Sequence, residues 1–527
     1  APREAVARPT KSPDANAAMK KWQTLGLPAL LAVAPLLFAG LTGPRMLSTF
    51  RATGDHAAIE LYTREAAAGR QLVGPHSRYG FHHPGPAFFY AAVPLYLAVG
   101  ERYAGIQMTA TLIAAVAFVA MIACASYGAG AAPAWAAAFA LSLAVHARGV
   151  GSIVSAWNPN VTALAFGTLL FALACLFAGA MRALPLAVVA GSLAVQSHLG
   201  CAPAALILGV LTAAALAWPA LRSRARLPVP ERRGPYVVAI SGGLLIVLWA
   251  PTLLDALAPG AGNLGTLAAF LAAPAPGHPL SDAAAVVGGQ VPALASGSAR
   301  GLVAGGLFAA ACWTAVAAYR RAAHTTLGLS LLCAAGIVLA TVSAMRAGGP
   351  LYPYLIRWSW TFWVGIVAAL LHVGMLAVGE RWQPDARARQ LLAGAGAVAL
   401  AALALAASWR VLQDAEEDDE HPQLQSERVE RLADALQATL RERGLRRPLI
   451  AVADPAAHPL GLGLLLELDK RGASFAAQPF GVFRFPPAWR PGSEDATLVL
   501  DRLARSQRRG ELVIREGPYR LELLSDG

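Results

Sequence analysis

The sequence predicts a polytopic α-helical membrane domain followed by a small soluble α/β domain. Only 14 % of the 527 residues are charged and 56 % are hydrophobic, whereas soluble domains carry about a quarter charged residues. Uncharged apolar runs such as 106–124, 302–318 and 358–378 reach the roughly 17–25 residues that a helix needs to cross a bilayer. The composition becomes more polar after Arg410, which places the soluble domain at 411–527.

Hydropathy predicts about 11 crossings in a transmembrane domain of residues 23–410. The segment 86–100 is short for a tilted span, so we expect it to lie in the membrane interface or to re-enter. The alternative is that one of the alanine-rich helices between 105 and 147 does not span. The expected crossings are 26–43, 105–125, 133–147, 161–180, 183–199, 201–218, 236–254, 302–318, 326–345, 359–377 and 390–408.

The basic residues set the expected orientation. The net charge is +12, but these residues gather in short loops, which is typical of cytoplasmic loops rather than of a nucleic-acid surface. We therefore expect a cytoplasmic N-terminal segment, 1–22, and a first apolar run that is an uncleaved helix rather than a signal peptide. The loops placed inside include 20–21, 222–233, 320–321 and 381–389, and those placed outside are 44–84, 146–160, 255–300, 345–357 and the tail.

The tail has the pattern of a small domain with its own core. Helical periodicity over 427–443 and strand-like runs at 448–452, 497–500 and 511–514 predict an α/β fold. The acidic run 414–420 is typical of a solvated linker. Asp454 follows a strand, where it either contacts a ligand or, as we favour, is a turn residue.

The outer loop 44–84 concentrates the residues that could perform chemistry on the outer face. It places acids, arginines and histidines between two apolar segments, although a connecting loop can be much shorter. Carboxylate chemistry on this face must come from a few acids or from the tail. The outer acids between 26 and 410 are Asp55, Glu60, Glu65, Glu101, Asp255 and Asp282, and the loop histidines are His56, His76, His82 and His83.

This loop resembles the first outer loop of the GT-C glycosyltransferases, most closely in the protein O-mannosyltransferase and aminoarabinose transferase branch. The resemblance rests on Gly-Asp at 54–55, on Arg-Glu at 64–65 and on the turn HPGPAFFY at 83–90. A multi-helix body followed by an outer soluble domain fits the same family. The chain departs from the pattern at His56, which replaces a second acid, and at Gly85, which interrupts a Pro-Pro turn.

The resemblance implies an inverting enzyme that takes a sugar from a polyprenyl-phosphate donor and passes it to a hydroxyl of a glycan, lipid or protein. Asp55 would be the general base, and arginines would neutralise the departing phosphate because their planar fork pairs two of its oxygens. The richness in Ala, Gly and Arg points to a GC-rich bacterial genome and hence to a bacterial plasma membrane, among its lipids, and the charge pattern makes the C-terminal domain extracytoplasmic. The arginine candidates are Arg64, Arg78 and Arg357.

Several of these candidates also have a purely structural explanation. Asp55 is a favoured N-cap for a helix that begins at the next residue. Glu60 and Glu65 could contact substrate or pair with Arg64 along that helix. Arg357, which lies in an aromatic segment, could instead reach lipid headgroups.

The remaining candidates leave similar alternatives open. His82 and His83 suit a phosphate-binding or structural role, and no metal ligands are assigned, although a divalent metal stays open as a cofactor. In the segment 146–160, Trp157 and Asn158 could contact substrate. Asn158 can orient a hydroxyl but cannot act as a base, and Asn-Pro equally well opens a helix. Tyr352 contacts substrate or anchors the chain at the interface.

Other function classes make different demands on the sequence. A lipid or sugar transporter or flippase would be expected to show ionisable residues at mid-membrane depth or broken helix pairs, and the apolar runs show neither. A scaffold for the tail has no need of so many charged residues in one loop. A ligase that uses polyprenyl-diphosphate glycans would share the outer arginines but needs no loop aspartate, so Asp55 separates it from a polyprenyl-phosphate enzyme.

Overall fold

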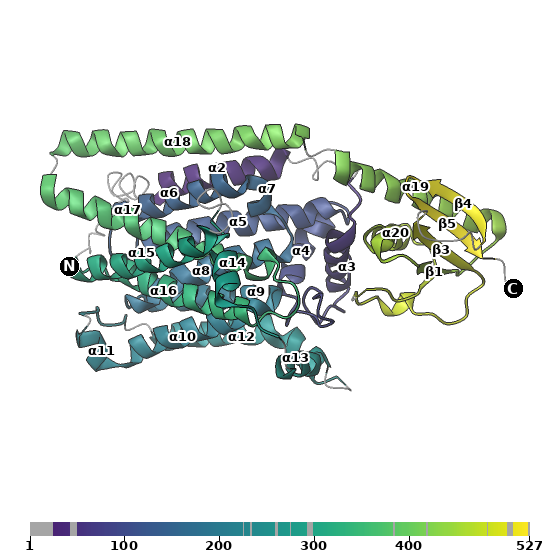
Figure 1. The fold of residues 1–527 in the computed structure, drawn as a ribbon, viewed down its shortest axis with the longest axis horizontal. Helices are drawn as coiled ribbons and strands as arrows, with labels where there is room; N and C mark the ends of the chain where they lie inside the picture. Colours follow the sequence, from purple (N-terminus) through teal and green to yellow (C-terminus); the bar gives the residue numbers. More distant parts are fainter. Residues whose placement is uncertain are drawn as a thin grey trace, which may run out of the picture.

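The computed structural model describes residues 25–42, 50–224, 226–231, 234–258, 262–273, 276–291, 299–382, 385–417, 420–481, 483–502 and 510–524. The predicted cytoplasmic segment 1–22, the start of the outer loop at 44–49 and part of the acidic run 414–420 lie outside the described residues. The described chain forms a long helical body with a small sheet domain at one end (Figure 1).

The body is a bundle of apolar helices that run along the long axis of the molecule (Figure 1). Among the described residues, eight helices are long and apolar enough to cross a membrane. They are α5 (Tyr103–Ala125), α8 (Asn158–Phe177), α10 (Ala202–Ala217) counted with the 3₁₀ turn Leu199–Cys201 that leads into it, α12 (Gly234–Ala256), α15 (Arg300–Arg320), α16 (His324–Met345), α17 (Trp360–Trp382) and α18 (Ala386–Glu417). The polytopic helical fold is confirmed.

Three further helices lie in the same bundle but are shorter or less apolar. They are α2 (Leu27–Thr42), α6 (Ala131–Arg148) and α9 (Leu184–Ser197). Each packs against helices of the long set: α2 against α5, α6 against α17 and α9 against α8. They stand where the first, third and fifth crossings are expected, and their crossing of the membrane stays a prediction.

Helix α8 forms the centre of the bundle. Every residue from Pro159 to Leu176 is buried, because α5, α9, α16 and α17 pack around it. A helix that is apolar on all sides requires such a position. A Cβ on Gly167 would meet Thr361 Cγ2 at 3.0 Å, so the absence of a side chain there lets α8 and α17 approach closely.

The segment 86–100 does not cross the bundle. Its helix α4 (Ala87–Ala98) has 12 residues, about 18 Å at 1.5 Å per residue, which is less than the roughly 30 Å of a hydrocarbon core. It packs between α3 (Gly54–Ala67) and α5 at one end of the body (Figure 1). This agrees with the expectation of an interfacial or re-entrant segment.

The loops expected inside and the loops expected outside lie at opposite ends of the body. At the end near the sheet domain, Tyr79 donates a hydrogen bond of 2.9 Å to the carbonyl of Gly348, which joins two segments expected outside. At the far end, Tyr127 donates to Glu231 at 3.0 Å, in the strongly basic loop expected inside. Which end faces the cytoplasm stays a prediction.

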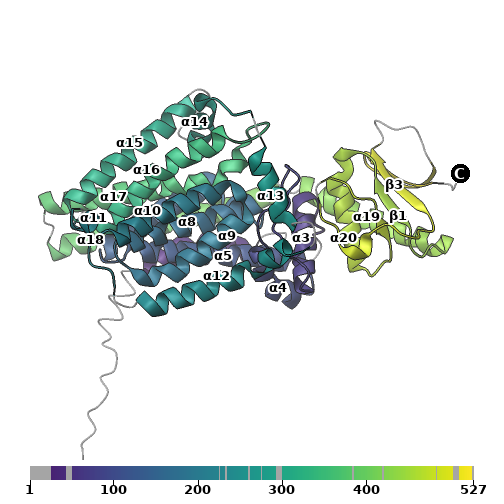
Figure 2. The ribbon, with the colours of Figure 1, turned by 90° about the horizontal axis from the view of Figure 1, so that it is seen from below.

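The C-terminal domain is built on a five-stranded sheet in the order β2-β1-β3-β5-β4. Strand β1 pairs in parallel with β2 and β3, while β5 pairs antiparallel with β3 and β4. One helix lies between the sheet and the body, and a second starts near the body and runs along the domain beside the sheet (Figures 1 and 2). The elements are α19 (Glu420–Arg443), α20 (His458–Lys470), β1 (Leu449–Val452), β2 (Ala476–Ala477), β3 (Thr497–Arg502), β4 (Glu511–Glu516) and β5 (Tyr519–Leu524).

The C-terminal domain contains the three predicted strands and two more, and Asp454 has one of the two roles considered for it. The three expected strands correspond to β1, β3 and β4, whereas β2 and β5 were not predicted. Asp454 is a turn residue, because its Oδ1 accepts a hydrogen bond of 2.8 Å from the amide of Ala456. Helix α18, with 32 residues, connects the far end of the body to this domain (Figure 1).

Candidate active site

Asp55 lies in the first turn of α3, at the end of the body near the C-terminal domain. The helix begins at Gly54, whose φ of +54° is easily adopted only by glycine. Thr53 takes the N-cap position, so the N-cap explanation of Asp55 is wrong. The carboxylate instead accepts a hydrogen bond of 2.8 Å from Trp157 Nε1 and lies 3.3 Å from His76 Nε2.

The surroundings of Asp55 favour its ionised form. Burial raises the pKa of this carboxyl, but the hydrogen bond and charge of His76, the hydrogen bond of Trp157 and the charge of His56 together hold the pKa below its ordinary value. The side chain is 49 % exposed. Asp55 is therefore an accessible carboxylate at neutral pH, fixed by partners on two other segments.

A short hairpin over residues 74–83 carries His76 and Arg78. The amide of His83 donates to the carbonyl of Pro75 at 2.8 Å, and His76 forms an antiparallel bridge with His82. The hairpin projects from the end of the loop that follows α3. It thereby brings an imidazole and a guanidinium to the same region as the carboxylate of Asp55.

Arg78 is held by aromatic rings. Its Cζ lies 4.7 Å from the ring centroid of Tyr352 and 5.2 Å from that of Tyr79, and the ring of Tyr352 stacks on Tyr354 at 5.7 Å. Cations over aromatic faces are stabilised by the ring quadrupole. Tyr352, expected to touch substrate or to anchor the chain, thus supports an arginine that faces the cavity described below.

The N-terminus of α8 brings Trp157 and Asn158 to the site. Asn158 is the first residue of this helix, which agrees with the structural explanation that Asn-Pro opens a helix. Its Nδ2 donates to the carbonyl of Ser197 at 3.1 Å. Arg357 donates to Asn160 Oδ1 at 2.6 Å and its Cζ lies 5.2 Å from the Trp157 ring. Arg357 therefore supports Trp157 and does not line the cavity, whereas Trp157 and Asn158 do.

The histidine pair lies in the hairpin with its rings largely buried. Burial lowers the pKa of His82 to about 4, and its Nδ1 lies 3.1 Å from the carbonyl of Gly74. Burial also lowers the pKa of His83 well below its ordinary value; its Nδ1 accepts from the amide of Leu199 at 3.1 Å. Both rings are therefore neutral at pH 7 and bind the backbone. In the described part of the chain, no three His, Cys, Asp or Glu side chains are grouped to hold a metal ion.

One cavity of about 1410 Å³ opens in front of these residues. Its remaining walls are mostly apolar and come from α9, α10, α12, α16 and the short helix α13 (Gly262–Ala272). The cavity is therefore amphipathic, with charged groups confined to one end. The polar lining there includes Asp55, His76, Arg78, His83, Asn158 and Arg346.

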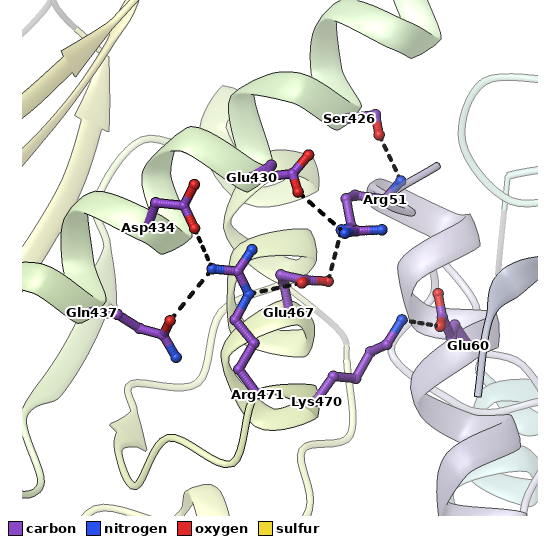
Figure 3. A network of polar contacts seen from close by, with 9 residues as sticks. All are labelled: Arg51, Glu60, Ser426, Glu430, Asp434, Gln437, Glu467, Lys470 and Arg471. Carbon is purple, nitrogen blue, oxygen red and sulfur yellow. Dashed lines mark hydrogen bonds and ion pairs between the residues drawn. The ribbon is translucent and has the colours of Figure 1, made fainter. Parts of the chain in front are cut away.

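Glu60, Arg64 and Glu65 were expected in the site but do not line the cavity. Lys470 Nζ lies 2.8 Å from Glu60 Oε1 (Figure 3), Arg64 Nε lies 2.9 Å from Asp469 Oδ2, and Glu65 is paired within its own loop. The reason is the helical repeat: at about 100° per residue, positions five and nine residues after the catalytic candidate point about 140° and 180° away from it. Glu60 and Arg64 thus face the C-terminal domain.

Several polar residues of the cavity were not predicted, among them His76, Arg346 and His198. His76 was noted only as one of the loop histidines, and Arg346, directly after α16, was not singled out. A signal for Arg346 was available, because it is one of only two arginines in the outer segment 345–357, the other being Arg357. For His76 the sequence offers no signal that distinguishes it from its neighbours.

Comparison with known proteins agrees with this architecture. No family model and no curated protein matches the sequence. Solved structures that match it include ArnT from Cupriavidus metallidurans bound to undecaprenyl phosphate, and the same protein in the apo state. Each is 14 % identical, with a TM-score of 0.57 over 94 % of this chain and 98 % of the other. The chain therefore has the fold of ArnT, a GT-C aminoarabinose transferase, as the resemblance of its outer loop predicted.

Proposed function

We propose that this protein is a membrane glycosyltransferase that moves a sugar from a polyprenyl-phosphate donor to an acceptor hydroxyl. The observation that carries the proposal is a single cavity with Asp55 and two arginines at one end and apolar walls along the rest. A polyprenyl-phosphate sugar likewise has a charged phosphate at one end and an apolar isoprenoid chain along the rest of its length. An ArnT of the same fold binds undecaprenyl phosphate, which supports a donor of this class.

The apolar part of the cavity suits an isoprenoid chain. Helix α10 lines it from Ala202 to Ala213, about 17 Å of helix, with Leu245 and Trp249 of α12 also in the wall. Bilayer lipids are as apolar as these side chains, so burial here adds little driving force. The groove instead aligns the chain so that its phosphate comes to the polar end.

Asp55 acts as general base in the proposed reaction. The acceptor oxygen attacks the anomeric carbon and gives its proton to the carboxylate, while the bond between that carbon and the phosphate oxygen breaks. The nucleophile and the leaving group lie on opposite faces, so the configuration inverts. A positioned proton acceptor typically contributes about 10²–10⁴-fold to the rate.

Arg78 and Arg346 stabilise the leaving group. The phosphate gains a negative charge when the sugar departs, and cations fixed in advance near that charge lower the barrier. A guanidinium can pair two phosphate oxygens at once. Arg78 is fixed by the rings of Tyr79 and Tyr352, so it needs little rearrangement to do so.

We place the site on the extracytoplasmic face of a bacterial plasma membrane. The supporting observation is that the strongly basic loops lie at the other end of the body, and such loops are typically cytoplasmic. The acceptor is then a glycan, lipid or protein that reaches the polar end of the cavity from outside.

The decisive experiment compares purified wild type with Asp55→Asn on a panel of polyprenyl-phosphate sugars. We expect the wild type to release polyprenyl phosphate and the variant to be slower by about 10²-fold or more. Asp282→Asn is the matched control, because Asp282 is exposed on α14 (Leu280–Gly288) and does not line the cavity. Equal rates for wild type and Asp55→Asn would remove Asp55 from the mechanism.

The same assay separates the rival functions. A ligase would release polyprenyl diphosphate from diphosphate-linked glycans and would tolerate Asp55→Asn. A transporter or flippase would move the intact donor across liposomes without releasing either lipid product. Either result would replace the proposed function.

A further inference from the structure

The C-terminal domain packs directly on the helix that carries Asp55. Beyond the Lys470–Glu60 and Asp469–Arg64 pairs, Arg51, just before α3, lies 3.3 Å from Glu430 and 3.2 Å from Glu467 (Figure 3). The side chain of Glu60 is only 1 % exposed. Separating Lys470 from Glu60 would leave a buried carboxylate without a compensating cation. The pair therefore favours one arrangement of the C-terminal domain on α3.

Backbone packing at the same place is too close for a side chain. A Cβ added at Gly463 of α20 would lie 2.6 Å from the carbonyl oxygen of Ala52, below any normal contact. Helix α20 therefore rests on the main chain three residues before Asp55. Movement of the C-terminal domain would be transmitted to the start of α3.

A second contact reaches the partner of the carboxylate. The ring of Phe483, in the loop that follows β2, lies 4.6 Å from the ring of His76 in an edge-to-face arrangement, and the next residue, Arg484, pairs with Asp255 at 3.4 Å. The Nδ1 of His76 is buried and makes no hydrogen bond among the described atoms. Its ring orientation toward Asp55 is therefore set by packing, chiefly on Phe483.

We propose that the C-terminal domain positions the catalytic carboxylate: α20 fixes the start of α3, and Phe483 holds His76 in the orientation in which it contacts Asp55. This inference rests on the proposed function. Phe483 is a positioning residue, since it acts on Asp55 only through His76. The other titratable and charged groups around this pair are His56 and Tyr62 on α3, His82 and His83 in the hairpin, and Arg484 next to Phe483.

The test is a double-mutant cycle on turnover with Phe483→Ala, His76→Ala and the double variant. We expect Phe483→Ala to lower kcat by about tenfold with the KM for donor nearly unchanged, and to add no further loss when His76 is already alanine. Phe483→Tyr should restore activity, because it keeps the ring. Leu512→Ala, on the edge strand β4 and 42 % exposed, is the control for loss of an apolar side chain from this domain.

A pH profile separates positioning from general damage to the domain. Loss of the His76 contact weakens an interaction that favours ionised Asp55, so the acid limb of kcat/KM should move to higher pH in Phe483→Ala. A domain that is merely less stable would lower the rate at all pH values alike. Additive effects in the cycle, or an unmoved acid limb, would overturn the proposal.

Hydrogen exchange provides a readout that does not need turnover. We expect Phe483→Ala to speed amide exchange in the hairpin 74–83, and Gly463→Val to speed it in α3, with the bundle helices unchanged. Unchanged exchange in both segments would overturn the positioning role. If the wild type releases no polyprenyl phosphate but exchange responds as expected, the proposed function fails and the coupling of the domain to Asp55 stands.

Discussion

Trp157 donates a hydrogen bond of 2.8 Å from its indole nitrogen to Asp55, although 102 positions separate the two residues. The same indole ring lies 5.2 Å from the guanidinium of Arg357. The first turn of α3, the start of α8 and the segment before α17 thus meet in one row of contacts. The indole of Trp157, which packs on Arg357, orients the carboxylate of Asp55. A substitution at Trp157 should therefore change the pKa of Asp55 while keeping its carboxylate.

Trp157→Phe should keep the ring and remove the donor. A hydrogen bond to the ionised form lowers a pKa, so its loss should raise the pKa of Asp55. Because the base must be ionised, the acid limb of kcat/KM should move to higher pH, with a loss of about tenfold near neutral pH from misorientation. The measurement is a pH–rate profile. Trp409→Phe, at an exposed tryptophan of α18, is the control, and superimposable profiles for Trp157→Phe would contradict the prediction.

Arg346→Ala should weaken use of the donor more than Arg346→Lys does. A charge-assisted hydrogen bond is worth about 1.5–3 kcal/mol, so kcat/KM should fall by about 10- to 100-fold in the alanine variant. Lysine keeps the charge but not the planar fork, and an intermediate value is expected. Arg320→Ala, at the far end of the body, provides the control. A normal kcat/KM in Arg346→Ala would leave Arg78 as the cation for the phosphate.

Gly209→Phe should obstruct the apolar part of the cavity. Gly209 lines the cavity on α10, and a Cβ there meets no atom within 4 Å, so the helix should tolerate the new ring. The KM should rise several-fold for a donor with a long isoprenoid chain and stay the same for one with two isoprene units. Gly374→Phe, equally open but outside the cavity lining, is the matched control. An equal response to both donors would mean that the chain lies elsewhere.

Lys470→Met should destabilise the docked C-terminal domain. Glu60 would keep its buried position without a cation, and breaking such a pair costs about 3–5 kcal/mol. Replacing both partners, in Glu60→Gln with Lys470→Met, should recover much of this loss. Thermal unfolding of the purified protein in detergent measures both effects. A single variant with the wild-type melting temperature would show that the pair does not hold the domain.

The sequence was informative about the membrane body because bilayer constraints act locally. Charge-free runs of the required length and the placement of arginines in loops identified the helices and sorted the loops to their two ends. The scarcity of outer acids left six candidates, and Asp55 was chosen among them because Gly54-Asp55 resembles the start of the GT-C outer loop. The same local reasoning placed Arg64 beside Asp55, although nine residues along a helix bring a side chain to the opposite face.

Contacts between distant segments escaped prediction. Glu60 and Lys470 are 410 positions apart, and neither residue carries a local sign of the other. Arg346 was passed over in favour of Arg357, although both lie in one outer segment, because aromatic neighbours drew attention to the latter. Those aromatics proved to support Trp157 and Arg78, a role that only the folded arrangement reveals.

The pairing of Glu60 with Lys470 also has a consequence for the order in which the protein matures. The helix that carries Asp55 leaves the ribosome early, whereas its cationic partner is made 410 residues later. At about 5–20 residues per second, the interval is roughly 20–80 s. During this time the membrane body can insert, but the helix lacks the charge that compensates Glu60. On the proposed function, a nascent chain should therefore stay inactive until the C-terminal domain has been synthesised and has docked on α3.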